Sequence, residues 1–342
     1  MELPRKVIIG NDILNIVGEM SVETGLSGKA AVITGEHTGK IAGEKVLTSL
    51  TNSKFNVEYL QVERGSSVEE VEMKLQKFSP DILFAVGGGR IIDLAKYISA
   101  RKRLKYVSIP TSAAHDGIAS PQASINLKTQ VSVKVNAPVA IIADIQVIKN
   151  SSFRLTASGC GDILAKFTAY RDWLLAHNIK GEYYGDYAAN LALMSAKLIV
   201  KNVALIRKES DEGIRIIVEA LISCGVAMSI AGSSRPCSGS EHLFSHALDA
   251  VAANRALHGE QCGVGTIMMA YLHRINWVKI RNVLKQIGAP TTAEELNVTP
   301  VQIVEALTKA HKIRPDRYTI LGENGLSEHA AYKLAKVTNV IE

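Results

Sequence analysis

The sequence has few cysteines, no apolar run of signal-peptide length near its start and no repeats. Its four cysteines form no C-x-x-C pair and no regular framework, which excludes a zinc finger or a disulfide scaffold. We expect all four to be small buried residues, namely Cys160, Cys224, Cys237 and Cys262. Because no stretch reads as a membrane span, the sequence predicts a cytoplasmic protein.

The charge pattern does not favour nucleic-acid binding. The net charge is +6, but the basic residues are scattered along the chain. The one basic cluster, residues 101–105, contains no aromatic side chain that could stack on a base. We interpret it as a solvated helix end. A positive balance also suits an anionic small substrate, because it raises the local concentration of anions.

The first 150 residues alternate between strand and helix patterns. The expected strands are short apolar runs, at residues 30–33, 55–62, 81–86, 106–109 and 139–143. Helical patterns fall between them, at residues 40–50 and 67–78. This alternation predicts a Rossmann-like parallel sheet of the doubly wound type.

After about residue 151 the pattern becomes helical throughout. Apolar residues recur with the 3.6-residue period over residues 163–174, 191–203, 214–222 and 263–272. The sequence therefore predicts an α/β domain over residues 1–150 and an all-helical domain over residues 151–342.

Two glycine-containing loops follow predicted strands in the first domain. Residues 86–96 read V-G-G-G-R-I-I-D-L-A-K, and backbone amides at such a helix start can approach a pyrophosphate closely. Residues 108–121 read S-I-P-T-S-A-A-H-D-G-I-A-S-P, a hydroxyl-rich loop at the sheet edge where ligands bind in open α/β folds. The alternatives are a tight turn without a ligand and, for Asp116, a turn cap beside Gly117.

The helical half contains a candidate metal site. Asp162 lies where we expect a helix to begin, and by itself it reads as an N-cap or a partner of Lys166. Residues 238–241 have capping-box form and start a predicted helix that holds His242 and His246 on one face. His258 lies at the turn into another helix. These histidines and Asp162 can build a divalent-cation site with a position left for substrate, or they can simply be hydrogen-bonded.

The order of these motifs resembles the sn-glycerol-1-phosphate dehydrogenase family, within the superfamily of glycerol dehydrogenases, iron-type alcohol dehydrogenases and dehydroquinate synthases. The resemblance rests on V-G-G-G-R-x-x-D-x-A-K, P-T-S-x-x-H-D-G-x-A-S-P, G-x-G-D-x-x-A-K, S-R-P-x-S-G-S-E-H and H-G-E-Q. It covers nearly the whole chain and implies a dehydroquinate-synthase-like fold.

The resemblance implies that residues 1–150 bind NADH or NADPH. The glycines and the aspartate of the first loop would hold the pyrophosphate and the neighbouring ribose, and the second loop would line the nicotinamide. The expected cofactor-binding residues are Gly87, Gly88, Gly89, Arg90, Ile91, Ile92, Asp93, Thr111, Ser112, Ala113, Ala114 and Ser120.

The resemblance also implies that residues 151–342 bind the metal and the substrate. Asp162, His242 and His258 match the metal ligands, and we expect Zn²⁺. Asp116 and His246 are expected to be catalytic. The expected substrate-binding residues are Asp116, Asp162, His246, Arg235 and Lys166, the last two as candidates for a phosphate.

The family reduces dihydroxyacetone phosphate to sn-glycerol 1-phosphate, the backbone of archaeal ether lipids. We therefore expect a homo-oligomeric dehydrogenase in which a metal polarises the ketone and the nicotinamide delivers hydride. Water or His246 would then supply the proton. Three alternatives are a glycerol dehydrogenase acting on the unphosphorylated substrate, a dehydroquinate-synthase-like lyase and a non-catalytic nucleotide-binding regulator.

Overall fold

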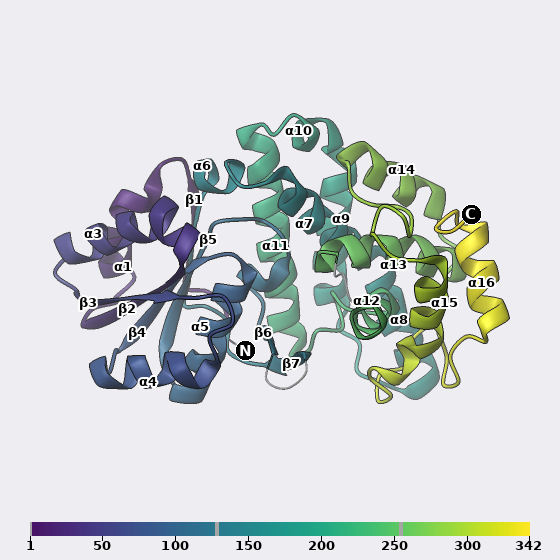
Figure 1. The fold of residues 1–342 in the computed structure, drawn as a ribbon, viewed down its shortest axis with the longest axis horizontal. Helices are drawn as coiled ribbons and strands as arrows, with labels where there is room; N and C mark the ends of the chain where they lie inside the picture. Colours follow the sequence, from purple (N-terminus) through teal and green to yellow (C-terminus); the bar gives the residue numbers. More distant parts are fainter. Residues whose placement is uncertain (1, 127–129, 253–255) are drawn as a thin grey trace. The chain divides into compact units, whose positions relative to one another are not determined.

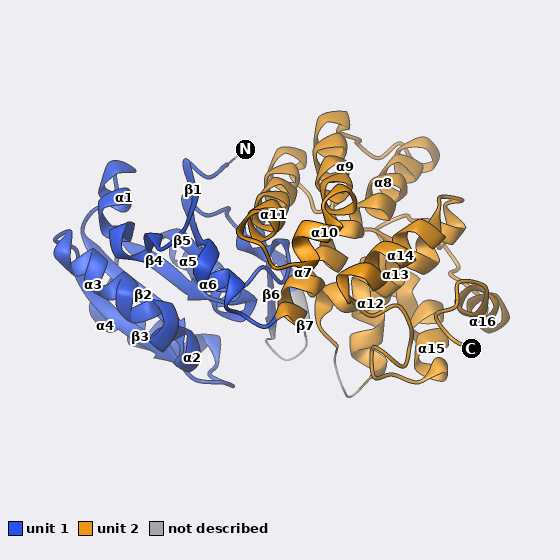
Figure 2. Cartoon of the chain, turned by 90° about the horizontal axis from the view of Figure 1, so that it is seen from above, with its two compact units in different colours: residues 1–152 blue, residues 153–342 orange. Residues whose placement is uncertain are grey.

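The computed structural model describes residues 2–126, 130–252 and 256–342 (Figure 1). The chain divides into two compact units, unit 1 with residues 1–152 and unit 2 with residues 153–342 (Figure 2). The division lies close to the predicted domain boundary near residue 150.

Unit 1 is built on a six-stranded parallel sheet in the order β1-β8-β5-β4-β2-β3. Its strands are β1 (Lys6–Gly10), β2 (Lys29–Gly35), β3 (Asn56–Val62), β4 (Ile82–Gly87), β5 (Lys105–Pro110) and β8 (Ala140–Asp144). The five predicted strands and the parallel sheet are confirmed. Strand β1 was not predicted, since it lies at the sheet edge and its residues are mostly half-buried. The antiparallel hairpin β6 (Gln122–Asn126) and β7 (Gln130–Lys134) was not predicted either.

Helices cover both faces of this sheet. Figure 1 shows α1 (Val17–Glu23) and α3 (Glu44–Asn52) on one face, with α4 (Val68–Phe78) and α5 (Gly89–Lys102) on the other. The shorter elements are η1 (Ile13–Ile16), α2 (Glu36–Thr38), η2 (Gly39–Gly43), η3 (Asp116–Ile118) and α6 (Ile145–Lys149). The predicted helix over residues 40–50 starts as the wider turn η2. The basic cluster ends α5 and is exposed, as predicted.

The sheet brings the two motif loops to one edge. Strands β4 and β5 are hydrogen-bonded neighbours, and Gly87 pairs with Pro110 at their carboxyl ends. The Thr111 amide donates to the Gly87 carbonyl oxygen at 3.1 Å. The glycine turn and the hydroxyl-rich loop therefore leave the sheet side by side, as ligand-binding loops of open α/β folds do.

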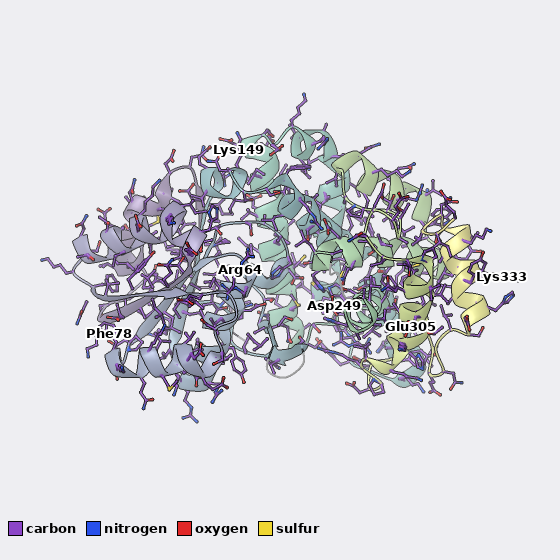
Figure 3. All side chains as sticks on the ribbon, viewed as in Figure 1. Arg64, Phe78, Lys149, Asp249, Glu305 and Lys333 are labelled. Carbon is purple, nitrogen blue, oxygen red and sulfur yellow. The ribbon has the colours of Figure 1, made fainter. Side chains whose placement is uncertain are left out.

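All the regular secondary structure in the described residues of unit 2 is helical, as predicted. Its elements are α7 (Phe153–Leu164), α8 (Lys166–Lys180), α9 (Asp186–Lys201), α10 (Val203–Arg207), α11 (Asp211–Ala231), α12 (Ser240–Val251), α13 (His258–Leu272), α14 (Trp277–Ile287), α15 (Pro300–Lys309), η4 (Ala310–Lys312) and α16 (Glu328–Val337). Exposed charged side chains such as Lys333 on α16 project away from the core (Figure 3). The four cysteines are buried and form no disulfide, as predicted.

Two expectations about these helices were wrong. Asp162 does not start a helix: it lies near the end of α7, and α8 begins at Lys166. The N-cap of α12 is Gly239 instead of Ser238, and its amide is satisfied by Glu241.

Helix α11 also corrects the expectation that no stretch reads as a membrane span. By length and composition it is apolar enough to cross a bilayer. More than half of that window is buried inside the protein, and residues such as Ile217, Leu221 and Cys224 are completely buried. Helix α11 is therefore a core helix of unit 2.

Glycines allow α7 and α13 to cross at very short range. A Cβ atom at Gly161 would lie 2.2 Å from the Gly259 carbonyl oxygen, and one at Gly259 would lie 1.9 Å from the Ser158 carbonyl oxygen. No residue larger than glycine fits at either position without a shift of the backbone. This crossing places the end of α7, with Asp162, against the start of α13, with His258.

Gly259→Ala should destabilise unit 2, because the added methyl group would meet a backbone oxygen that cannot rotate away. Overpacking costs roughly 1–3 kcal/mol, and we expect a loss near the upper end of that range. Urea denaturation measures it. Gly263→Ala is the matched control on the same helix, since its methyl group would meet the end of the Leu284 side chain at 3.1 Å. Equal stability of Gly259→Ala and the wild type would contradict this account of the crossing.

Candidate active site

The three glycines of the β4–α5 turn have different surroundings. A Cβ atom at Gly87 would lie 2.8 Å from the Ile91 side chain, and one at Gly89 would lie 1.9 Å from Nε2 of His115. At Gly88 the nearest atom would be Oγ of Ser112 at 3.5 Å, an ordinary contact. A larger residue at position 87 or 89 would therefore displace the Ile91 or His115 side chain, whereas at Gly88 it would make only an ordinary contact.

A buried lysine that sequence reasoning missed holds the two loops together. Lys96 is completely buried, and its ammonium donates to the carbonyl oxygens of Gly117 and Gln122 at 2.7 Å each. It also donates to Oδ1 of Asp93 at 3.1 Å, while Oδ2 of Asp93 accepts from the Ser124 amide at 3.2 Å. Asp93 and Lys96 thus fix the loop. The i,i+3 spacing of Asp93 and Lys96 on one helix was the feature of the sequence that could have indicated their ion pair. The contact of Asp93 with a ribose stays a prediction.

The hydroxyl-rich loop is ordered by a hydrogen bond between the His115 side chain and the loop backbone. Nδ1 of His115 accepts from the Gly117 amide at 3.0 Å, so His115 caps the turn that Asp116 begins. Thr111, Ser112 and Ser120 are buried, whereas Asp116 is only half-buried. The remaining predicted cofactor residues differ in environment: Ile91, Ile92 and Ala113 are buried, Ala114 is half-buried, and Arg90 donates to the Glu63 carbonyl oxygen.

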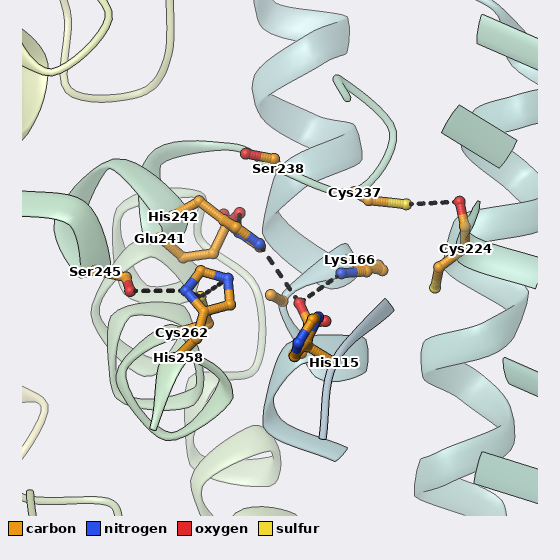
Figure 4. Close-up of polar contacts among 12 residues, drawn as sticks. His115, Lys166, Cys224, Cys237, Ser238, Glu241, His242, Ser245, His258 and Cys262 are labelled. Carbon is orange, nitrogen blue, oxygen red and sulfur yellow. Dashed lines mark hydrogen bonds and ion pairs between the residues drawn. The ribbon is translucent and has the colours of Figure 1, made fainter. Parts of the chain in front are cut away.

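In unit 2 the structure brings the predicted metal ligands together (Figure 4). Nε2 of His242 lies 3.4 Å from Oδ1 of Asp162, and the rings of His242 and His258 are 5.1 Å apart between centroids. Cys262 joins them, with Sγ 3.5 Å from Nε2 of His258. Among the described residues, His242, His258 and Cys262 each offer one ligand atom within 4.8 Å of the others. Asp162 contacts this group through His242.

Both histidines are held from behind by hydrogen bonds. Nδ1 of His242 donates to Oε1 of the buried Glu241 at 2.8 Å, and Nδ1 of His258 lies 3.3 Å from Oγ of Ser245. Thr168 and the Gly239 amide donate to the Glu241 carboxylate at 2.6 Å each. With Nδ1 engaged, each ring turns Nε2 toward the cluster. Metal-binding histidines commonly use one ring nitrogen for such a hydrogen bond and the other for the metal. Glu241 was missed, although it directly precedes His242.

The charges in the cluster depend on one another. Burial opposes ionisation of Asp162, but Lys166 and then His242 outweigh it and hold the pKa of this carboxyl well below its usual range. Nζ of Lys166, completely buried, donates to Oδ1 of Asp162 at 2.9 Å. Burial raises the pKa of the Cys262 thiol, yet His242 and His258 lower it to about 7.

His246 lies beside the cluster and differs from its neighbours. Its ring centroid is 5.7 Å from that of His258. Burial first, and then the charges of His258 and His242, lower the pKa of His246 to about 3. The imidazole is therefore neutral near pH 7 and can donate one hydrogen bond.

Arg235 has partners that identify it as a structural residue. It is buried and forms a bidentate ion pair with Glu182, in which Nε donates to Oε1 at 2.7 Å and a second nitrogen donates to Oε2. Its third nitrogen donates to the Tyr318 carbonyl oxygen at 2.9 Å. All three guanidinium nitrogens are engaged within the protein, which argues against the predicted phosphate contact. Lys166, the other candidate, is the partner of Asp162.

The donor set fits a divalent metal. Asp162 offers an ionised carboxylate, and His242 and His258 offer imidazole nitrogens oriented by Glu241 and Ser245. Carboxylate oxygen and imidazole nitrogen are ligands that zinc and iron both accept.

Comparisons with known proteins agree with this fold. A family model described as iron-containing alcohol dehydrogenase matches residues 8–151. Among solved structures, glycerol dehydrogenase from Schizosaccharomyces pombe has a TM-score of 0.81 at 22% identity, covering 99% of this chain and 90% of that chain. An iron-containing alcohol dehydrogenase from Thermococcus thioreducens has a TM-score of 0.77 at 13% identity and covers 100% of both chains. These structural likenesses show the shared fold.

Sequence relatives are much more similar. Glycerol-1-phosphate dehydrogenase [NAD(P)+] of Thermococcus kodakarensis is 52% identical over 345 residues, covering 100% of this chain and 98% of the relative. The protein of the same name from Methanosarcina acetivorans is 50% identical, covering 100% of this chain and 96% of the relative. The chain therefore belongs to the glycerol-1-phosphate dehydrogenase [NAD(P)+] family.

Proposed function

We propose that the protein catalyses the NAD(P)H-dependent reduction of dihydroxyacetone phosphate to sn-glycerol 1-phosphate, a backbone for ether lipids. The observation that carries the proposal is full-length identity of 50–52% with glycerol-1-phosphate dehydrogenases in a chain that groups Asp162, His242 and His258. The enzyme is an oxidoreductase, and its substrate and product follow the relatives' name.

We assign the cofactor to unit 1 and the metal to unit 2. The half-buried Gly88 at the start of α5 supports pyrophosphate binding there, because a helix N-terminus favours an anion. Thr111, Ser112 and Ser120 stay assigned to the nicotinamide side, and Asp116 to the substrate. The side-by-side exit of the two loops from β4 and β5 supports both assignments.

We assign Asp162, His242 and His258 as the metal ligands and Zn²⁺ as the metal. A carboxylate and two imidazoles suit zinc and iron alike, and zinc is the ion that we propose. Three protein ligands leave a position for substrate, so Cys262 would lie behind the site without binding the metal. Lys166 would keep Asp162 ionised.

The protein's own part in the reaction is orientation and charge. A divalent cation would polarise the ketone oxygen, and the nicotinamide would supply hydride to the adjacent carbon. Glu241 holds the His242 ring, and Ser245 holds the His258 ring. His246, neutral near pH 7, would donate a hydrogen bond to the substrate oxygen, and a proton would reach that oxygen from water or through this ring.

The proposal also covers location and assembly. The absence of disulfides among the four buried cysteines supports a reducing, cytoplasmic location. Helix α9 exposes Tyr187, Met194 and Leu198 along one face, and this supports formation of a homo-oligomer.

A steady-state assay tests the proposed reaction. The protein should consume NADH or NADPH stoichiometrically with dihydroxyacetone phosphate, and much more slowly with dihydroxyacetone. Faster turnover of dihydroxyacetone would identify a glycerol dehydrogenase instead. Absence of net cofactor consumption with either ketone would exclude an oxidoreductase and leave a lyase or a regulatory protein.

Gly88→Val should weaken NAD(P)H binding by about 1.4 kcal/mol or more, which is about tenfold, because its side chain would fill the space at the start of α5. Gly88→Ala should have a smaller effect in the same direction. Fluorescence titration with NADH measures the dissociation constant. The alanine variant should keep wild-type stability, since its Cβ atom would lie 3.5 Å from Ser112. Unchanged affinity in folded Gly88→Val would remove the pyrophosphate from this turn.

Asp162→Asn, His242→Ala and His258→Ala should each lose the metal on dialysis, because removal of one of three protein ligands greatly weakens binding. Elemental analysis of the folded variants measures occupancy independently of activity. Cys262→Ser is the matched control, and it should retain the metal. Full occupancy in any of the first three variants would remove that residue from the ligand set, and loss in the serine variant would add the sulfur to it.

A further inference from the structure

Two arginines that the sequence analysis did not single out, Arg314 and Arg317, belong to a segment that contacts the chain leading into α12, the helix that carries His246. This segment lies between η4 and α16, and η4 packs against α12. Arg317 donates to the Ser238 carbonyl oxygen and to Oγ of Ser234, each at 2.9 Å, and so reaches the segment that leads into α12. The charges of Arg314 and Arg317 both contribute to the low pKa of His246.

These two arginines carry positive charge that the protein does not neutralise by direct contact. The partners of the Arg317 guanidinium are uncharged oxygens of Ser234 and Ser238. Among the described residues, the Arg314 side chain has no hydrogen bond or ion pair. Burial, and then repulsion by Arg314 and Arg235, lowers the pKa of Arg317 to about 10, although the carboxylates of Glu182 and Asp316 act in the opposite direction. Arg317 therefore stays charged near pH 7. Two neighbouring cations without a directly bound carboxylate are typical of an anion site.

The other groups that could bind an anion near His246 are already engaged. Arg235 is paired with Glu182, and Lys166 with Asp162. At the start of α12, the Gly239 amide donates to Glu241. The Ser240 amide donates to Asp172 at 2.6 Å. The helix start is therefore closed to a ligand, and the two arginines remain.

We propose that Arg314 and Arg317 bind the phosphate group of the ketone substrate and so make the enzyme specific for a phosphorylated ketone. This inference rests on the proposed function and goes beyond it by naming the residues that recognise the phosphate. In dihydroxyacetone phosphate, one methylene group and one ester oxygen separate the carbonyl carbon from phosphorus. A phosphate site formed by these arginines, beside the segment that leads into α12, therefore suits a ketone bound at His246 on the same helix.

The two arginines have different parts in this recognition. Arg314 has its whole guanidinium available, and its planar fork can donate two parallel hydrogen bonds to a phosphate. Arg317 uses its two terminal guanidinium nitrogens to donate to Ser238 and Ser234, and it adds a second positive charge beside that of Arg314. Arg314 is therefore the cleaner position to test, because its replacement disrupts no hydrogen bond of the described protein.

The test compares Arg314→Gln and Arg317→Lys with the wild type. Lys312→Gln is the matched control, since it removes one exposed positive charge two residues from Arg314. The measurements are kcat/KM for dihydroxyacetone phosphate and for dihydroxyacetone, and the inhibition constant of inorganic phosphate. Arg314→Gln should lower kcat/KM for the phosphorylated ketone by about tenfold or more and weaken phosphate inhibition similarly. Its kcat/KM for dihydroxyacetone should change less than about twofold.

Arg317→Lys should shift the same ratio in the same direction by a smaller factor, because lysine keeps the charge but not the fork. Lys312→Gln should leave the ratio unchanged. Equal losses for both ketones in the two arginine variants, or unchanged phosphate inhibition, would overturn the assignment of these arginines. A wild-type enzyme without preference for the phosphorylated ketone would instead overturn the proposed function, and this inference with it.

Discussion

The ion pair between Asp162 and Lys166, buried beside His242, is the interaction on which the site depends. A carboxylate with 1% exposure keeps its charge because Lys166, also completely buried, and His242 compensate for lost hydration. Asp162 reaches this place because glycines let α7 and α13 approach at backbone contact. The fold thus holds an ionised carboxylate in a buried environment, where it would attract a divalent cation strongly.

A second buried carboxylate, Asp172, connects three segments of unit 2. Asp172 on α8 accepts from the Ser240 amide and hydroxyl at the start of α12, and from the Ile320 amide in the segment that carries the arginines. It also pairs with His273 at the end of α13. One side chain therefore joins three elements that surround the histidines. This network sets the start of α12 and occupies its amides, which leaves recognition of an anion to arginine side chains.

Much of this architecture could be predicted from the sequence, because apolar runs and the 3.6-residue period report burial directly. The histidine pair on α12 and the start of α13 at His258 also followed from spacing. Asp162 was misplaced because glycines at positions 159 and 161 read as a turn, whereas Gly161 serves close packing within a helix. The partners of Lys96, Arg235 and Arg317 depend on segments far apart in the chain, so local pattern could not reveal them.

We propose that Asp162, His242 and His258 hold one catalytic cation, with Cys262 outside its coordination shell. X-ray diffraction from crystals of the zinc-loaded enzyme, recorded on both sides of the zinc absorption edge, tests it most directly. The account predicts one strong anomalous peak at bonding distance, about 2.0–2.2 Å, from Asp162, His242 and His258. The Cys262 sulfur should lie beyond bonding distance. A peak bonded to Cys262, or a fully loaded site that Asp162 does not touch, would contradict it.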